Sequence, residues 1–143
     1  METALTVRSS LTHDGDGLVR FAITARNQSF TAATLAWGNT SDHQDLANAL
    51  VGFPATAKSH VAYRFGSPGT GTCDLEFSCT DKLGHVGVWA SVEAEYPVNN
   101  SERFESARVF LNCEPAAIDA FVQSLKNFAA GSENVAVLRG HGP

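Results

Sequence analysis

The side chains most able to do chemistry lie in the stretch "FSCTDKLGHVGVWASVE", which covers residues 77–93. Cys79, Asp81 and His85 stand close together in this stretch. A cysteine beside a histidine can act as a nucleophile with its general base, and an aspartate beside a histidine can orient the imidazole for proton transfer. Which of these pairs can meet depends on the strands and the turn that carry the side chains.

A hairpin that turns at 81–84 brings apolar residues of its two flanking segments opposite one another. The predicted pairs are Cys79 with Val86, Phe77 with Val88, Leu75 with Ala90 and Cys73 with Val92. A slip of one residue would destroy this agreement. Cys79 therefore points into the core and away from His85, which disfavours a Cys–His nucleophilic pair. Asp81 can still reach His85 across the turn, and this favours a turn-stabilising or solvent-exposed histidine over a catalytic or ligand-binding one.

Three other motifs resemble ligand sites. "GSPGTGT" at 66–72 lacks the lysine of a phosphate-binding loop and leads into a strand, so a flexible hairpin connection is the better interpretation. "DGDG" at 14–17 lacks the final acid of a calcium loop. "SDHQD" at 41–45 gathers acids and a histidine at a predicted helix start. Acids there complement the helix dipole, and a metal site is the lesser alternative.

Composition indicates one domain over 1–143, because 143 residues with 43% hydrophobic content can bury a core. A net charge of -5 with three lysines disfavours nucleic acid as a partner. The chain has no basic start followed by an apolar run and no segment of about 20 apolar residues, so we expect a cytoplasmic protein that contacts no membrane. The three cysteines have no disulfide or zinc spacing, which predicts buried free thiols, and we expect no cofactor or metal.

Alternation of apolar and polar residues predicts an α+β fold: a single antiparallel β-sheet of about six to seven strands with two helices packed on one face. The predicted strands are 4–11, 18–26, 29–37, 60–65, 73–79, 85–96 and 107–113, and 134–140 is either an edge strand or a surface segment. One helix follows a Ser41–Gln44 capping box and stops at 52–54. The other runs from Pro115 towards Gly131. We expect Phe121, Val122 and Leu125 of this helix to pack on Phe77, Val88 and Leu111.

The opposite, polar face of the predicted sheet is the candidate binding surface. It would gather Arg20, Arg26, Glu76, Trp89, Glu93, Glu95, Arg108 and Phe110. Exposed aromatic residues among arginines and acids are typical of protein interfaces. The predicted binding residues are Trp89, Glu93, Glu95, Arg108 and Phe110, with His85 at the rim. The alternatives are that loops or a dimer partner cover this face, or that Trp89 packs beneath the N-terminal strands.

Four stretches carry a family resemblance: "FAITARNQSF", "DLANALVGFP", "CTDKLGHVGVWASVE" and "EPAAIDAFVQSL". Together they resemble a family of short bacterial proteins with no assigned activity, some of which look like immunity proteins encoded beside secreted toxins. The matching motifs are structural, so the resemblance transfers no functional residue.

The leading hypothesis is a non-enzymatic protein-binding module, in the specific case an immunity protein that neutralises a toxin. Its partner would be another protein, with a basic surface, and a homodimer is a further alternative. The second hypothesis is a small enzyme whose loop site uses Asp81 and His85 together with Asp42 or His43. The third is a small-ligand-binding domain with a pocket between the sheet and the helices.

Overall fold

The computed structural model describes residues 2–12, 15–95 and 105–141, which contain eight strands and two helices. The strands are β1 (Ala4–Ser9), β2 (Leu18–Arg26), β3 (Thr31–Asn39), β4 (His60–Gly66), β5 (Thr70–Cys79), β6 (Val86–Glu95), β7 (Ser106–Cys113) and β8 (Asn134–Arg139). The helices are α1 (Asp42–Leu50) and α2 (Pro115–Lys126). The α+β prediction is confirmed, and the segment at 134–140 supplies a strand.

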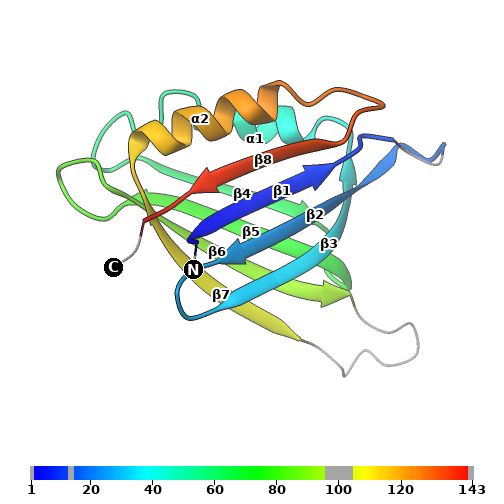
Figure 1. Ribbon diagram of the computed structural model, residues 1–143, viewed down its shortest axis with the longest axis horizontal. Helices are drawn as coiled ribbons and strands as arrows, with labels where there is room; N and C mark the ends of the chain where they lie inside the picture. The colour runs from blue at the N-terminus through cyan, green and yellow to red at the C-terminus, as the bar shows by residue number, and fades with distance from the viewer. Residues whose placement is uncertain (1, 13–14, 96–104, 142–143) are drawn as a thin grey trace.

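The strands form two antiparallel sheets of four, so the prediction of a single sheet is wrong. Sheet A has the order β3-β2-β1-β8 and sheet B the order β4-β5-β6-β7. Figure 1 shows the two sheets face to face, with their strands crossing. The physical reason lies in the amount of apolar surface, because two short helices cover too little area to bury one face of eight strands. Each sheet buries its apolar face against the other.

The alternation within each strand decides which side chains enter the space between the sheets. In β2, Val19, Phe21 and Ile23 are completely buried, whereas Arg20 and Arg26 are exposed on the other side. The β5–β6 hairpin has the predicted register, with Phe77 opposite Val88.

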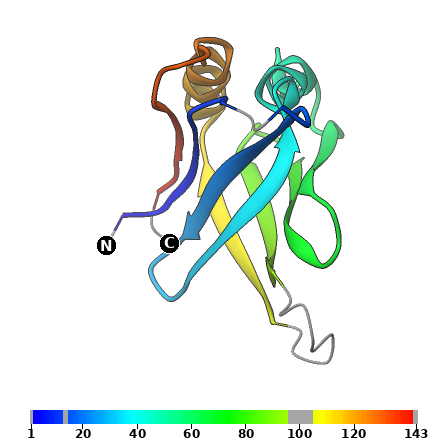
Figure 2. The same cartoon turned by 90° about the vertical axis from the view of Figure 1, so that its right-hand side faces the viewer.

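The helices pack side by side over one long edge of the two sheets, with α2 along β8 and α1 near β4 (Figures 1 and 2). His43 joins them, because its Nδ1 lies 2.8 Å from the Leu125 carbonyl oxygen and its ring stacks on Phe128. The predicted capping box does not form, since the Ser41 side chain makes no cap hydrogen bond. The Asp42 carboxylate instead accepts a hydrogen bond of 2.7 Å from the backbone N–H of Asn39.

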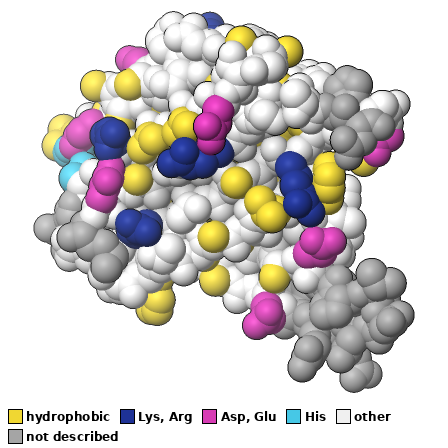
Figure 3. All heavy atoms as spheres, turned by 45° about the vertical axis from the view of Figure 1, so that its right-hand side comes forward, with side chains coloured by type: hydrophobic (Ala, Val, Ile, Leu, Met, Phe, Trp, Pro, Cys, Tyr) yellow, Lys and Arg dark blue, Asp and Glu magenta, His cyan; other side chains and the backbone are white. Residues whose placement is uncertain are grey.

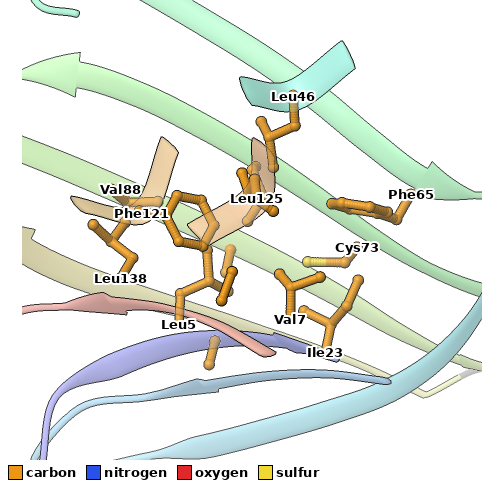
Figure 4. Close-up of a cluster of buried hydrophobic side chains, with 14 of the residues drawn as sticks. Leu5, Val7, Ile23, Leu46, Phe65, Cys73, Val88, Phe121, Leu125 and Leu138 are labelled. Atoms are coloured by element: carbon orange, nitrogen blue, oxygen red, sulfur yellow. The ribbon is translucent and has the colours of Figure 1, made fainter. Parts of the chain in front are cut away.

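One continuous apolar core connects both sheets and both helices (Figure 4). All six residues of the predicted helix–sheet core are buried within it: Phe77, Val88, Leu111, Phe121, Val122 and Leu125.

The sheets also meet directly, at the point where β3 crosses β5. A Cβ atom on Gly71 would lie 2.2 Å from the Leu35 carbonyl oxygen, so only glycine permits this approach. The Thr34 hydroxyl then donates a hydrogen bond of 2.8 Å to the Glu93 carbonyl oxygen. The glycine-rich stretch at 66–72 forms the predicted hairpin connection between β4 and β5, and Gly71 in it also allows the two sheets to approach each other.

In the described part of the chain, neither helix has the length and apolarity needed to cross a membrane.

Candidate protein interface

The outer face of sheet B carries a stacked group of four side chains, which we call the Trp89 cluster: Trp89, Phe110, Arg108 and Glu76. The ring centroids of Trp89 and Phe110 are 4.8 Å apart. The Arg108 guanidinium carbon lies 4.0 Å from the centroid of the Trp89 ring, a cation–π contact. Arg108 Nη2 also lies 3.6 Å from Glu76 Oε2. The cluster therefore joins an aromatic pair to a charged pair.

The register of sheet B produces this group. Trp89 lies opposite Glu76 on one side and opposite Phe110 on the other, so the three share one row across β5, β6 and β7. Gly87 leaves room for the Phe110 ring, because a Cβ atom there would lie 2.7 Å from Phe110 Cζ. Asn27, in the turn between β2 and β3, donates from Nδ2 to the Phe110 carbonyl oxygen at 2.9 Å. Sequence reasoning missed Asn27, since nothing local connects it to β7.

The cluster is accessible from outside the molecule. Trp89 and Phe110 are half-buried, while the side chains of Arg108 and Glu76 are both 53% exposed. Val88 and Ala90 of β6 face the core between the sheets, and Trp89 alternates with them on the other side, so the alternative in which Trp89 packs beneath the N-terminal strands of sheet A is wrong. The prediction that Arg20 and Arg26 share this face is also wrong, because β2 carries them on the outer face of sheet A.

The outer face of sheet B is acidic. It holds the acids Asp74, Glu76, Glu93 and Glu95 and the arginines Arg64 and Arg108. The Arg64 guanidinium donates two hydrogen bonds to the Asp74 carboxylate, of 2.6 and 3.1 Å. Within the described residues, no ion pair or hydrogen bond engages the side chains of Glu93 and Glu95. The unpaired carboxylates make this face attractive to a positively charged partner.

His85 lies at the turn that precedes β6, between two carboxylates. Its Nδ1 is 2.5 Å from Asp81 Oδ2, and its Nε2 is 3.6 Å from Glu114 Oε1. The same Glu114 oxygen lies 3.5 Å from His141 Nε2. Sequence reasoning found Asp81 but missed Glu114 and His141, which reach the turn only because β7 and the chain end beyond β8 pair beside it.

The arrangement around His85 stabilises the turn. Asp81 Oδ1 accepts hydrogen bonds from the backbone amides of Leu83 and His85, at 2.8 and 3.3 Å. The hydrogen bond with Asp81 raises the pKa of His85, and nearby Glu114 raises it further. The hydrogen bond with His85 lowers the pKa of Asp81. These shifts favour the charged pair, which suits a structural salt bridge better than a general base that must release its proton.

The other groups that sequence analysis considered for chemistry have separate partners. The Cys79 thiol lies 3.6 Å from the Thr56 carbonyl oxygen, whereas His85 contacts Asp81. Cys79 is half-buried, so the prediction that all three thiols are buried is wrong for this one, which lies at the end of β5 against the 55–59 loop. Asp42 accepts a hydrogen bond from the Tyr63 hydroxyl, and His43 is buried between the helices.

The other two thiols, Cys73 and Cys113, are buried in the core. Burial raises the pKa of Cys73 and of Cys113 to about 12, which keeps both as thiols. Across the described ranges, no three His, Cys, Asp or Glu side chains are placed to hold a metal ion.

No protein-family model, curated protein or solved structure matches this chain. The Trp89 cluster and the charges around it are therefore the basis on which a function can be argued.

Proposed function

We propose that this protein is a non-enzymatic protein-binding module whose interface is the outer face of sheet B. Its partner is a protein with a basic surface. The observation that carries the proposal is the partly exposed Trp89 ring, which contacts Arg108 and Phe110 on the outer face of sheet B. Neutralisation of a secreted toxin, as an immunity protein, is the specific role that the resemblance to short bacterial proteins suggests.

The physical chemistry of the cluster supports binding. Tryptophan and arginine dominate the energetics of protein interfaces, because they bury large areas in contact with a partner. Stacking of Arg108 and Phe110 on Trp89 restricts all three side chains before the partner arrives. Less side-chain entropy is then lost on binding. Glu93 and Glu95 add long-range attraction for a basic partner, which accelerates encounter.

The chain offers a matched control for the central residue. Trp37 lies on the outer face of sheet A, with the Arg20 guanidinium carbon 4.7 Å from its ring centroid. Each tryptophan is thus half-buried beneath an arginine, but on a different sheet. Trp89→Ala and Trp37→Ala therefore remove the same side chain from comparable surroundings, and a difference between them reports on the face.

The experiment first identifies the partner with a photo-crosslinking amino acid at Ser91, which neighbours the cluster on the outer face of sheet B, in cells of the source organism. The affinity of the purified partner is then measured by calorimetry. Trp89→Ala should weaken binding by about 2 kcal/mol or more, roughly thirtyfold. Trp37→Ala should leave the affinity within about twofold, and His85→Ala should have little effect because His85 lies at the rim. Circular dichroism checks that each variant is folded.

Equal losses in the Trp89 and Trp37 variants would show that the outer face of sheet B is the wrong surface. For the immunity role, the product of the adjacent gene is the decisive probe. Cells that produce the adjacent gene's product should grow again when the wild-type protein is co-expressed. They should not grow when the Trp89→Ala variant is co-expressed instead. If the product of the adjacent gene is not toxic, the immunity role is wrong. The binding experiment with the Trp89 and Trp37 variants does not depend on that result.

A further inference from the structure

The outer face of sheet A concentrates positive charge on an acidic protein. Four of the ten basic residues of the chain lie on it, although the net charge is -5. They are Arg8, Arg20, Arg26 and Arg139. The acidic outer face of sheet B, which carries the Trp89 cluster, lies on the opposite side, so the two broad surfaces of the molecule carry opposite charge.

The register arranges these arginines in a stripe. Ala4 pairs with Arg26 on one side and with Arg139 on the other, so the two arginines flank a single small residue. Arg8 lies opposite Ala22, and Arg20 lies opposite Trp37. Arg26 lies six positions after Arg20 in β2, which corresponds to roughly 20 Å along a strand. The stripe is therefore longer than a small metabolite.

The stripe includes a hollow of about 380 Å³. Arg8, Arg26, Arg139 and Glu2 line it together with the smaller residues Ala4, Thr6, Thr24 and Val137. Glu2 forms an ion pair with Arg139. No described residue forms an ion pair or hydrogen bond with the guanidinium of Arg8 or Arg26. Two cations beside this hollow are thus available to external anions.

Apolar side chains flank the same stripe. Leu35 is 45% exposed and Val135 is 39% exposed, and both lie in the row that contains Arg8. Figure 3 shows basic and apolar side chains interspersed across this part of the surface, with acidic side chains beside some of them, and Glu133 shares a shallow hollow with Arg8, Arg20 and Leu35. The mixture matches a polypeptide that presents both carboxylates and aliphatic side chains.

We propose that the outer face of sheet A is a docking surface for an acidic polypeptide segment of a partner protein. Charge complementarity with Arg8 and Arg26 selects the acidic partner, and Leu35 and Val135 contact its aliphatic side chains. Single-stranded nucleic acid fits less well, because the guanidinium of Arg20 already covers the Trp37 ring that would stack on a base. A symmetric dimer through this face would oppose arginine to arginine. The proposal does not depend on the Trp89 cluster.

The test uses fluorescence anisotropy at low ionic strength with a labelled peptide of alternating glutamate and leucine. The double variant Arg8→Gln, Arg26→Gln is compared with Lys58→Gln, Lys82→Gln, which removes two exposed positive charges elsewhere and so has the same net charge. The arginine variant should bind the peptide at least tenfold more weakly than the wild type, and the lysine variant within about twofold. Glu2→Gln should strengthen binding, because it frees Arg139.

Five results would overturn the proposal. The first is absence of peptide binding, and the second is equal weakening in the two double variants. The third is tighter binding of a ten-nucleotide thymidine strand than of the acidic peptide, which would indicate a nucleic-acid surface. The fourth is complete competition by inorganic phosphate at matched ionic strength, which would indicate a small oxyanion site. The fifth is self-association, measured by sedimentation velocity, that disappears in the arginine variant, which would identify a second copy as the occupant.

Discussion

Gly71 tests how the two sheets are held together. Its backbone has a φ of +85°, and a Cβ atom there would lie 2.2 Å from the Leu35 carbonyl oxygen and 3.0 Å from Thr34 Oγ1. Gly84, in the β5–β6 turn, has a similar φ of +92°, but a Cβ atom there would meet nothing within 4 Å. Gly71→Ala therefore introduces backbone strain and a collision, whereas Gly84→Ala introduces backbone strain alone.

The magnitudes follow from these two terms. A non-glycine residue in the left-handed region costs roughly 1–2 kcal/mol, and this applies to both variants. Relief of the Gly71 contact requires β3 and β5 to separate, because the atom in the way belongs to the backbone. Overpacking of this kind costs typically 1–3 kcal/mol. We expect Gly71→Ala to lower the free energy of unfolding by about 2–5 kcal/mol and Gly84→Ala by about 1–2 kcal/mol.

Urea unfolding monitored by circular dichroism measures both losses, and equal m-values would confirm that the denatured states are comparable. The entropy that alanine removes from the unfolded chain is similar in the two variants and cancels in the difference. The refuting result is a Gly71→Ala protein no less stable than Gly84→Ala. That result would mean that the sheets do not approach through Gly71, and the account of how the sandwich closes would be wrong.

Two further predictions concern the core and the turn. Phe121→Ala should cost about 3–5 kcal/mol in denaturant melts, because the ring is fully buried in the core; a loss below about 1 kcal/mol would reject that packing. NMR titration should place the pKa of His85 above the usual value of about 6.5, and Asp81→Asn should move it back. Because the pKa of His85 is raised and that of Asp81 is lowered, the pair contributes its full stability between about pH 4 and 6.5. The contribution falls as the pH rises through the raised histidine pKa, and again as it falls through the lowered aspartate pKa. An unshifted His85 would contradict the contact.

The sequence by itself determined the local structure, because that information lies in the spacing of neighbouring residues. Alternation with a period of two predicted the strands, and the apolar stripe of α2 predicted Phe121 and Leu125 as core residues. The β5–β6 register was also accessible, since only one alignment placed Phe77 opposite Val88 with apolar residues throughout. Trp89 could therefore be assigned to the side of the hairpin away from the core.

Only the tertiary structure decided how the strands are divided between two sheets. Alternation reports which side of a strand is buried, and it is equally satisfied by a helix layer or by a second sheet. For this reason Arg20 was expected beside Trp89 but lies on the opposite outer face. Contacts between residues distant in sequence, such as that of Glu114 with His85, could not be predicted from the sequence either. The need for glycine at position 71 could not be predicted, because it arises from the backbone of β3. That strand lies next to Gly71 only because the two apolar sheets pack together.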